Sequence, residues 1–194
     1  MRLPLLKSWP LLAAAWWCTG AAAAPVTYEI DPSHTYPSFE ADHMGLSVWR
    51  GKFNQTAGKV WLDRAAGSGS VDLVVDLDSV DFGLDSMNQV AKGSTLFDVA
   101  RHPYARYQGQ LVGFENGAPT RVEGQLSLHG VSRPLALQVL RFKCQPHPLF
   151  KREVCGADAL AQFNRADFGL DAGRAYGFDM QVTLRIQVEA VAVP

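Results

Sequence analysis

The chain has 194 residues, with 18 basic and 19 acidic side chains and a formal net charge of −1. This length favours one domain once the N-terminal segment is set aside. No cluster of Lys or Arg follows that segment, which argues against nucleic-acid binding. After residue 24, no apolar run approaches the roughly 20 residues of a membrane-spanning helix.

The first 23 residues have the organisation of a bacterial secretory signal peptide. Arg2 and Lys7 precede an apolar run, and a series of small residues leads to the predicted cleavage site after Ala23. Cleavage there leaves a mature domain of residues 24–194. It also removes two basic residues, so the net charge falls from −1 to −3. We therefore expect a protein that is exported to the periplasm.

Two cysteines remain in the mature chain, Cys144 and Cys155, because Cys18 leaves with the signal peptide. In an oxidising compartment, a pair so close in sequence predicts a disulfide. Closing a loop of about 12 residues in this way stabilises the fold by roughly 3 kcal/mol in the chain-entropy model. The pair lacks Cys-x-x-Cys spacing, so the sequence favours the disulfide over a redox-active or metal-binding pair.

Alternating apolar and polar residues predict a series of strands along the mature chain. The first half contains five such segments, at 26–30, 38–43, 51–53, 58–63 and 71–77. In the last of them, the residues predicted to face inward are Val71, Leu73, Val75 and Leu77. The pattern then changes to helical spacing, because Met87, Val90 and Ala91 share one helical face. Ser86 has the spacing of a capping box and Gly93 would end the helix. We expect one short helix, which packs at the mouth of a barrel.

The second half of the chain again predicts strands, at 105–114, 121–129, 135–142, 158–163 and 178–190. In the segment at 121–129, the residues predicted to face inward are Val122, Gly124, Leu126 and Leu128. The last segment alternates strictly, with Phe178, Val182 and Leu184 on its apolar face. Such a strand would be about 43 Å long and would need equally long neighbours for its backbone groups. Curling an antiparallel sheet shut supplies those neighbours and removes the edges. The expected fold class is all-β: a long-stranded antiparallel barrel with one short helix.

The expected barrel has dimensions that suit a long ligand. A strand tilt of about 40° would make it roughly 33 Å tall, about the reach of an extended long-chain lipid. Barrels of about eight strands are either filled by their own side chains or hold one small ligand. The small inward residues Ala41, Gly109 and Gly124 favour a tunnel over a filled interior.

Five motifs occur in order along the mature chain. They are Tyr28–Asp31 with His34, Phe39, His43 and Gly51–Phe53; Leu96–Asp98; His102–Tyr104; Gly124–Pro134; and Phe163–Leu170. Together they resemble the motifs of the YceI-like family, and the resemblance runs from about Tyr28 to Ala190. Two features depart from the family pattern. Pro37 is expected to interrupt an early strand, and an insertion carries the cysteine pair.

The resemblance implies a lipocalin-like antiparallel barrel in the bacterial periplasm, which holds one long apolar ligand. In the family this ligand is usually a polyisoprenoid, such as an isoprenoid quinone or a polyprenyl chain, and some relatives hold fatty-acid amides. The resemblance implies no catalytic activity and no cofactor other than a bound isoprenoid lipid or quinone.

Aromatic and apolar residues at inward or motif positions are the candidates for ligand contact, with a few polar groups near the mouth. The candidate ligand-binding residues are Phe39, His43, Phe53, Leu96, Phe97, Tyr104, Phe114, Phe163, Arg165 and Phe168. Each aromatic ring could instead fill an ordinary core. Arg165 could meet a polar headgroup through its planar donors, or it could pair with Asp167 and brace a turn.

The histidines do not predict a metal site, because no two of them have a known ligand spacing. We expect His34 and His43 to be hydrogen-bonded in the core, and the alternative is a place near the ligand headgroup, because both match family motifs. We expect His102, His129 and His147 to lie in loops. We expect Asp98 to cap or turn the chain. The sequence also contains no Gly-x-Ser-x-Gly elbow and no zinc signature, so we predict no catalytic or metal-binding residues.

Three classes of function are compatible with these features. The leading hypothesis is a non-enzymatic periplasmic carrier or store for a polyisoprenoid or a similar amphiphilic lipid. The alternatives are an isomerase or hydrolase acting on an apolar substrate at the barrel mouth, and a module that binds a periplasmic partner. A homodimer through the barrel edges or the cysteine loop is also compatible with the chain, and no residue pattern decides it.

Overall fold

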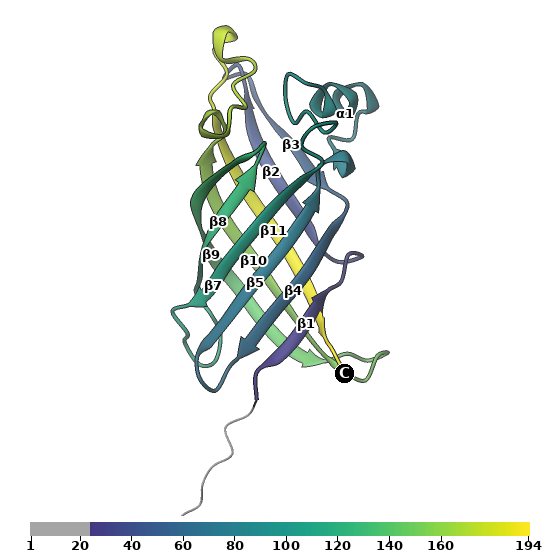
Figure 1. Cartoon of the computed structure of the whole chain (residues 1–194), viewed down its shortest axis with the longest axis vertical. Coiled ribbons are helices and arrows are strands. Elements are labelled where there is room, and N and C mark those ends of the chain that lie inside the picture. Colours follow the sequence, from purple (N-terminus) through teal and green to yellow (C-terminus); the bar gives the residue numbers. More distant parts are fainter. Residues whose placement is uncertain (1–23) are drawn as a thin grey trace, which may run out of the picture.

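A computed structural model describes residues 24–194, so the predicted signal peptide lies outside the described residues. One antiparallel sheet of 11 strands dominates this part of the chain (Figure 1). Its strands are β1 (Val26–Ile30), β2 (Tyr36–His43), β3 (Ser47–Phe53), β4 (Thr56–Asp63), β5 (Ser68–Asp76), β6 (Val80–Asp81), β7 (Tyr104–Val112), β8 (Arg121–Leu128), β9 (Val131–Pro146), β10 (Glu153–Asn164) and β11 (Gln181–Ala192).

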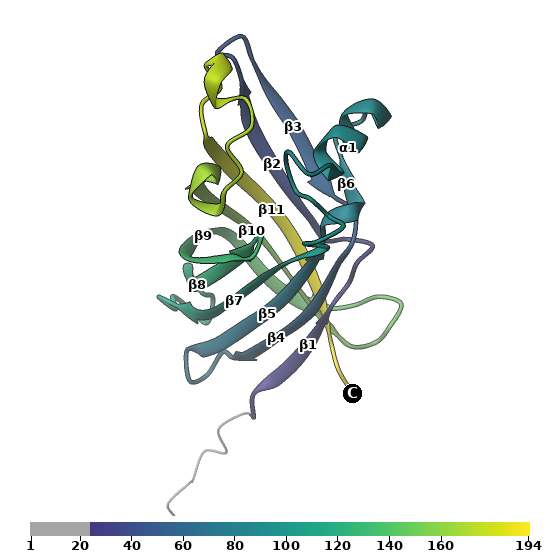
Figure 2. The ribbon, with the colours of Figure 1, turned by 45° about the horizontal axis from the view of Figure 1, so that its top comes forward.

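Eight of these strands close into a barrel in the order β1-β4-β5-β7-β8-β9-β10-β11, because β11 also pairs with β1. The closing pairs join Tyr28 to Ala192 and Ile30 to Ala190. The other half of β11, Val182–Gln187, pairs with β2 instead. From there β3 and β6 extend the wall on one side of the mouth (Figure 2). The predicted all-β antiparallel barrel is confirmed.

The longest strands differ in their bounds from those predicted. β9 and β10 extend to the hairpin that carries the disulfide between Cys144 and Cys155, which confirms the predicted pairing. β11 begins at Gln181 rather than at residue 178. The reason is a turn: the Asp179 carboxylate accepts a hydrogen bond from the Gln181 N–H, which ends the extended pairing there. At 12 residues and a tilt of about 40°, β11 makes a barrel wall roughly 30 Å tall.

Pro37 does not interrupt its strand, so that expectation was wrong. It is the second residue of β2 and pairs with Ile186 of β11. The pairing of β2 with β3 begins only at Ser38, opposite Lys52. Pro37 therefore lies at the start of the strand, where β2 has a neighbour on one side, and that is a position at which sheets tolerate proline.

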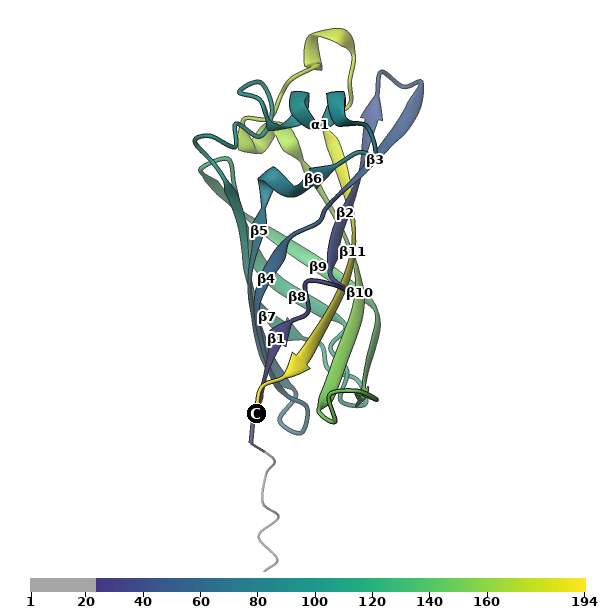
Figure 3. The same cartoon turned by 90° about the vertical axis from the view of Figure 1, so that its right-hand side faces the viewer.

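The helix α1 (Asp85–Lys92) lies at the mouth end of the barrel, as predicted (Figure 3). Its N-terminal cap is Leu84, which makes no side-chain hydrogen bond, so the predicted capping box at Ser86 was wrong. Gly93 ends the helix as expected, and its N–H donates to the carbonyl of Val90. Within residues 24–194, no helix combines the length and apolarity needed to cross a bilayer.

The interior glycines Gly109 and Gly124 accommodate other side chains, so they do not provide the open space on which the tunnel prediction relied. A Cβ atom at Gly124 would lie 2.5 Å from the ring and hydroxyl of Tyr107. That ring is held in place because the Tyr107 hydroxyl donates to the carbonyl of Leu135 at 2.8 Å. A Cβ at Gly109 would lie 2.8 Å from Val122. Both glycines therefore serve packing across β7 and β8.

Gly124→Ala is expected to destabilise the fold by about 1–3 kcal/mol, because the added methyl collides with the anchored Tyr107 ring. Gly156→Ala is the matched control, since its Cβ would meet Glu189 at an ordinary 3.5 Å. That control should be neutral or slightly stabilising, because alanine restricts the unfolded chain. Urea unfolding of the domain 24–194 measures both changes. Equal stability of the two variants would contradict this account.

Candidate functional site

A cavity of about 480 Å³ runs along the inside of the barrel. At one end it reaches Cys155 and Phe142, near the disulfide, and at the other it reaches Met87 of α1 and Phe178 of the loop before β11. The volume lies within the roughly 300–1,000 Å³ of pockets that enclose small organic ligands. The interior of the barrel is therefore hollow, as the tunnel prediction required.

Alternate residues of each strand make the cavity wall, because successive side chains of a strand point to opposite faces. The inward faces carry aliphatic side chains that the alternation pattern had placed inside. These include Val71, Leu73 and Val75 of β5, Val122, Leu126 and Leu128 of β8, and Val182, Leu184, Ile186 and Val188 of β11. Such a wall offers an apolar ligand dispersion contact along its whole length and few hydrogen bonds.

Aromatic rings gather toward the mouth of the cavity. Phe39 packs against Phe53 with ring centroids 5.5 Å apart, and against Phe82 at 5.2 Å. Phe53 packs edge-on against Phe97 at 5.6 Å. All four rings line the cavity, and they come from β2, β3, the segment between β6 and α1, and the loop after α1. This aromatic cluster lines the part of the cavity that lies near α1.

Six of the ten predicted ligand-binding residues line the cavity: Phe39, Phe53, Leu96, Phe97, Phe163 and Arg165. Phe168 is buried behind the lining and packs edge-on against Phe163 at 5.4 Å. Phe114 is partly buried and packs against the barrel core and Gly67, without being part of the lining. Tyr104 is 60% exposed, because Ala105 and Tyr107 take the inward positions of β7. These three residues do not face the cavity.

The two histidines predicted to lie in the core occupy different surroundings. His43 stacks on Trp49 at 4.2 Å and meets Phe178 edge-on at 5.1 Å, so it supports two lining rings from behind. His34 is exposed, which contradicts the prediction. Its Nδ1 lies 2.8 Å from the Asp31 carboxylate, and this hydrogen bond raises the pKa of His34.

Arg165 lies at the mouth, at the start of a short 3₁₀ turn that Asn164 caps. Its guanidinium donates to the carbonyls of Leu170 at 2.6 Å and Ala172 at 2.7 Å. These hydrogen bonds to main-chain carbonyls stabilise the turn, and the predicted pairing of Arg165 with Asp167 was wrong. Burial lowers the pKa of Arg165 from its ordinary value. Arginine nevertheless stays charged at neutral pH, so a cation faces the end of the cavity.

Two charged residues, Asp42 and Arg165, stand among the described residues that line the cavity. The Asp42 carboxylate accepts hydrogen bonds from the N–H of Gly45 at 2.9 Å and of Asp179 at 3.0 Å. It thereby ties the β2–β3 hairpin to the loop before β11. The Asp42 carboxylate is therefore hydrogen-bonded to main-chain N–H groups. The Arg165 guanidinium has five N–H donors, and the carbonyls of Leu170 and Ala172 accept two of them.

A sequence model described as the YceI-like domain matches residues 28–190. The chain belongs to the YceI-like family. A UPF0312 protein of Yersinia pestis (strain Pestoides F) is 28% identical over 180 residues, which cover 90% of this chain and 91% of that one. A UPF0312 protein of Vibrio parahaemolyticus is 24% identical over 173 residues, with 89% of each chain covered.

Solved structures share the fold of this YceI-like chain. Burkholderia cenocepacia BcnA matches with a TM-score of 0.65 and 17% identity, over 83% of this chain and 99% of that one. A polyisoprenoid binding domain from Saccharophagus degradans, implicated in plant cell wall breakdown, matches with a TM-score of 0.60 and 20% identity, over 87% and 99%. The Campylobacter jejuni YCEI protein matches with a TM-score of 0.65 and 17% identity, over 78% and 90%.

Several residues of this YceI-like cavity escaped the sequence analysis. Trp49 and Phe82 line the mouth, and no motif marked them. Thr56 lines the cavity and is 4% exposed, and its hydroxyl oxygen is buried without a hydrogen-bond partner among the described residues. Thr56 is the first residue of β4, and its side chain points inward. The alternation of inward and outward residues along this strand is the signal that could have revealed it.

Proposed function

We propose that this YceI-like protein binds one long apolar ligand, a polyisoprenoid or a similar amphiphilic lipid, inside its barrel. It acts as a non-enzymatic carrier or store in the periplasm. The observation that carries this proposal is the apolar cavity, which extends from the disulfide end to α1 and is lined by aliphatic and aromatic side chains. Burial of an apolar chain there is favourable by about 25 cal/mol per Å² removed from water.

The charge distribution supports one orientation of the ligand. The apolar tail occupies the barrel interior, and the polar head lies at the mouth near Arg165. The guanidinium is already oriented by the carbonyls of Leu170 and Ala172, so it offers further N–H donors to a carbonyl, quinone or anionic headgroup at little entropic cost. Thr56 supplies a buried hydroxyl group on the cavity wall.

Two further observations support this function. The Saccharophagus degradans domain with the same fold is described as polyisoprenoid-binding. The Cys144–Cys155 disulfide is typical of proteins in an oxidising compartment, which supports export to the periplasm. Together with the hollow barrel, they favour a binding protein that shields a water-insoluble ligand.

Mass spectrometry of organic extracts tests the proposal. Protein purified from the periplasm without detergent is expected to carry an isoprenoid or other long-chain lipid at close to one molecule per chain. An empty protein that also binds no added isoprenoid would overturn the proposal. Incubation of the loaded protein should return the same lipid unchanged, whereas chemical conversion would favour the isomerase or hydrolase alternative.

A further inference from the structure

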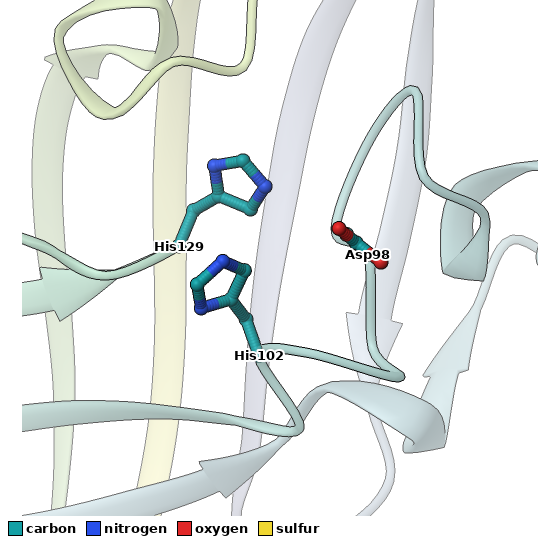
Figure 4. Close-up of side chains that lie close together, drawn as sticks. All are labelled: Asp98, His102 and His129. Carbon is teal, nitrogen blue, oxygen red and sulfur yellow. The ribbon is translucent and has the colours of Figure 1, made fainter.

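Three residues with metal-binding side chains meet beside the mouth, outside the cavity lining (Figure 4). Asp98 and His102 belong to the loop between α1 and β7, and His129 belongs to the turn between β8 and β9. One ligand atom of each side chain lies within 4.8 Å of those of the other two. The imidazole centroids of His102 and His129 are 4.5 Å apart.

The hydrogen bonds of His129 determine which of its nitrogens can bind a metal. Its Nδ1 lies 3.2 Å from the carbonyl oxygen of Phe168, and a carbonyl can only accept, so Nδ1 carries the proton. In the neutral ring Nε2 then has a free lone pair. This atom is buried and has no hydrogen-bond partner among the described residues. An imidazole that donates one N–H to a backbone carbonyl and presents the other nitrogen is the usual state of a metal-bound histidine.

Asp98 is held firmly in position by its backbone. It has a φ of +48°, its N–H donates to the carbonyl of Gly93, and its carbonyl accepts from the N–H of Arg101 and His102. The residue is 5% exposed, so its carboxylate is buried. The partner of that carboxylate is the guanidinium of Arg101, whose side chain is 73% exposed. An exposed arginine of this kind adds little stability and can turn away into solvent.

Gly130 provides the space for the second imidazole. A Cβ atom at this position would lie 3.1 Å from Cε1 of His102, and the backbone φ of +77° also favours glycine. The ring of His102 can therefore lie against the turn that carries His129. The α1–β7 loop and the β8–β9 turn thus place two imidazoles and one carboxylate close together.

We propose that Asp98, His102 and His129 form a site for a divalent transition-metal ion, with Zn²⁺ as the best-matched ion. Two imidazoles and one carboxylate, completed by water, are a common ligand set for tetrahedral Zn²⁺. Ligand atoms around such an ion are roughly 3.4 Å apart, so the side chains close inward by about 1 Å on binding. The ion takes the place of the Arg101 guanidinium beside Asp98.

The ion would join three segments of the mouth. Asp98 follows the lining residues Leu96 and Phe97 directly, and the carbonyl bonded to His129 belongs to the turn that starts at Arg165. Metal binding therefore restrains the loop that carries Phe97 of the aromatic cluster and the turn that carries the mouth arginine.

Calorimetric titration of the tag-free, EDTA-treated domain 24–194 with Zn²⁺ tests the site. The wild-type protein is expected to bind one ion per chain. His129→Ala and His102→Ala should each weaken binding by at least about 100-fold, the upper end of the loss seen for outer-shell partners. His147→Ala is the matched control, because His147 lies in the β9–β10 hairpin at the opposite end of the barrel and should leave the affinity unchanged.

Two additional measurements keep the test decisive if an alanine variant unfolds. Asp98→Asn preserves the shape of the side chain and should lower the Zn²⁺ affinity while the far-ultraviolet circular dichroism stays unchanged. Substituting Co²⁺ in the wild-type protein should give the visible absorption bands of a four- or five-coordinate site. The absence of saturable binding in the wild type would overturn the proposal. So would equal affinity in the His129→Ala, His102→Ala and His147→Ala variants.

Discussion

Ala159→Phe is expected to remove most lipid binding and to leave the barrel folded. Ala159 is 7% exposed, lies on β10 and faces the cavity between its strand neighbours Val139 and Ile186. A benzyl group at this position projects into the space that the ligand would occupy. Overpacking costs about 1–3 kcal/mol, which corresponds to a loss of affinity of roughly 5- to 150-fold. Mass spectrometry of co-purified lipid measures the loss.

Ala136→Phe is the matched control for this experiment. Ala136 lies on β9 opposite Glu123, and its side chain faces outward. The same substitution there adds the same ring without entering the cavity, so lipid content should match that of the wild type. Unchanged lipid content in Ala159→Phe, with a melting temperature close to that of the wild type, would place the ligand outside the barrel.

Removing the disulfide is expected to lower the melting temperature by about 6–12 °C. The bond closes a loop between residues 11 positions apart, and the chain-entropy model assigns roughly 3 kcal/mol to a loop of this size. In a domain of 150–250 residues, each kcal/mol corresponds to about 2–4 °C. The double variant Cys144→Ala/Cys155→Ala retains small apolar side chains at both positions. Circular dichroism melting of the domain 24–194 measures the change.

Reductant provides the control for the disulfide prediction. Reduction of the wild-type protein should lower its melting temperature by a similar amount. The double variant should show no response to reductant, because it has no disulfide to lose. A wild-type melting temperature that is indifferent to reductant would mean that the β9–β10 hairpin holds this end of the barrel without the covalent bond.

The local pattern of the sequence predicted which strand residues point inward. Alternation along β5, β8 and β11 identified the inward positions correctly, with Leu73, Val122 and Leu184 all facing the cavity. This works because side chains alternate across a strand whatever its neighbours are. The disulfide followed from a cysteine pair in a predicted oxidising compartment. Both inferences depend on residues that are close together in the sequence, and no knowledge of the strand pairing is needed for them.

Other features depended on residues far apart in the chain. The sequence did not reveal that β11 pairs with β1 along one half and with β2 along the other. Nor did it reveal that Gly124 makes room for Tyr107, since that contact crosses from β8 to β7. The space inside a barrel depends on how the side chains of facing strands pack together. The sequence of a single strand does not show which strands will face it.

The sequence by itself determined the fold class, the inward face of the strands, the disulfide and the family motifs. The tertiary structure decided the partners of the polar groups. Arg165 braces its turn through main-chain carbonyls rather than through Asp167, and His102 and His129 meet although 27 positions separate them in the sequence. Periodicity reports on which face of a strand is buried, but hydrogen bonds and metal-binding geometry form only when loops from different strands converge.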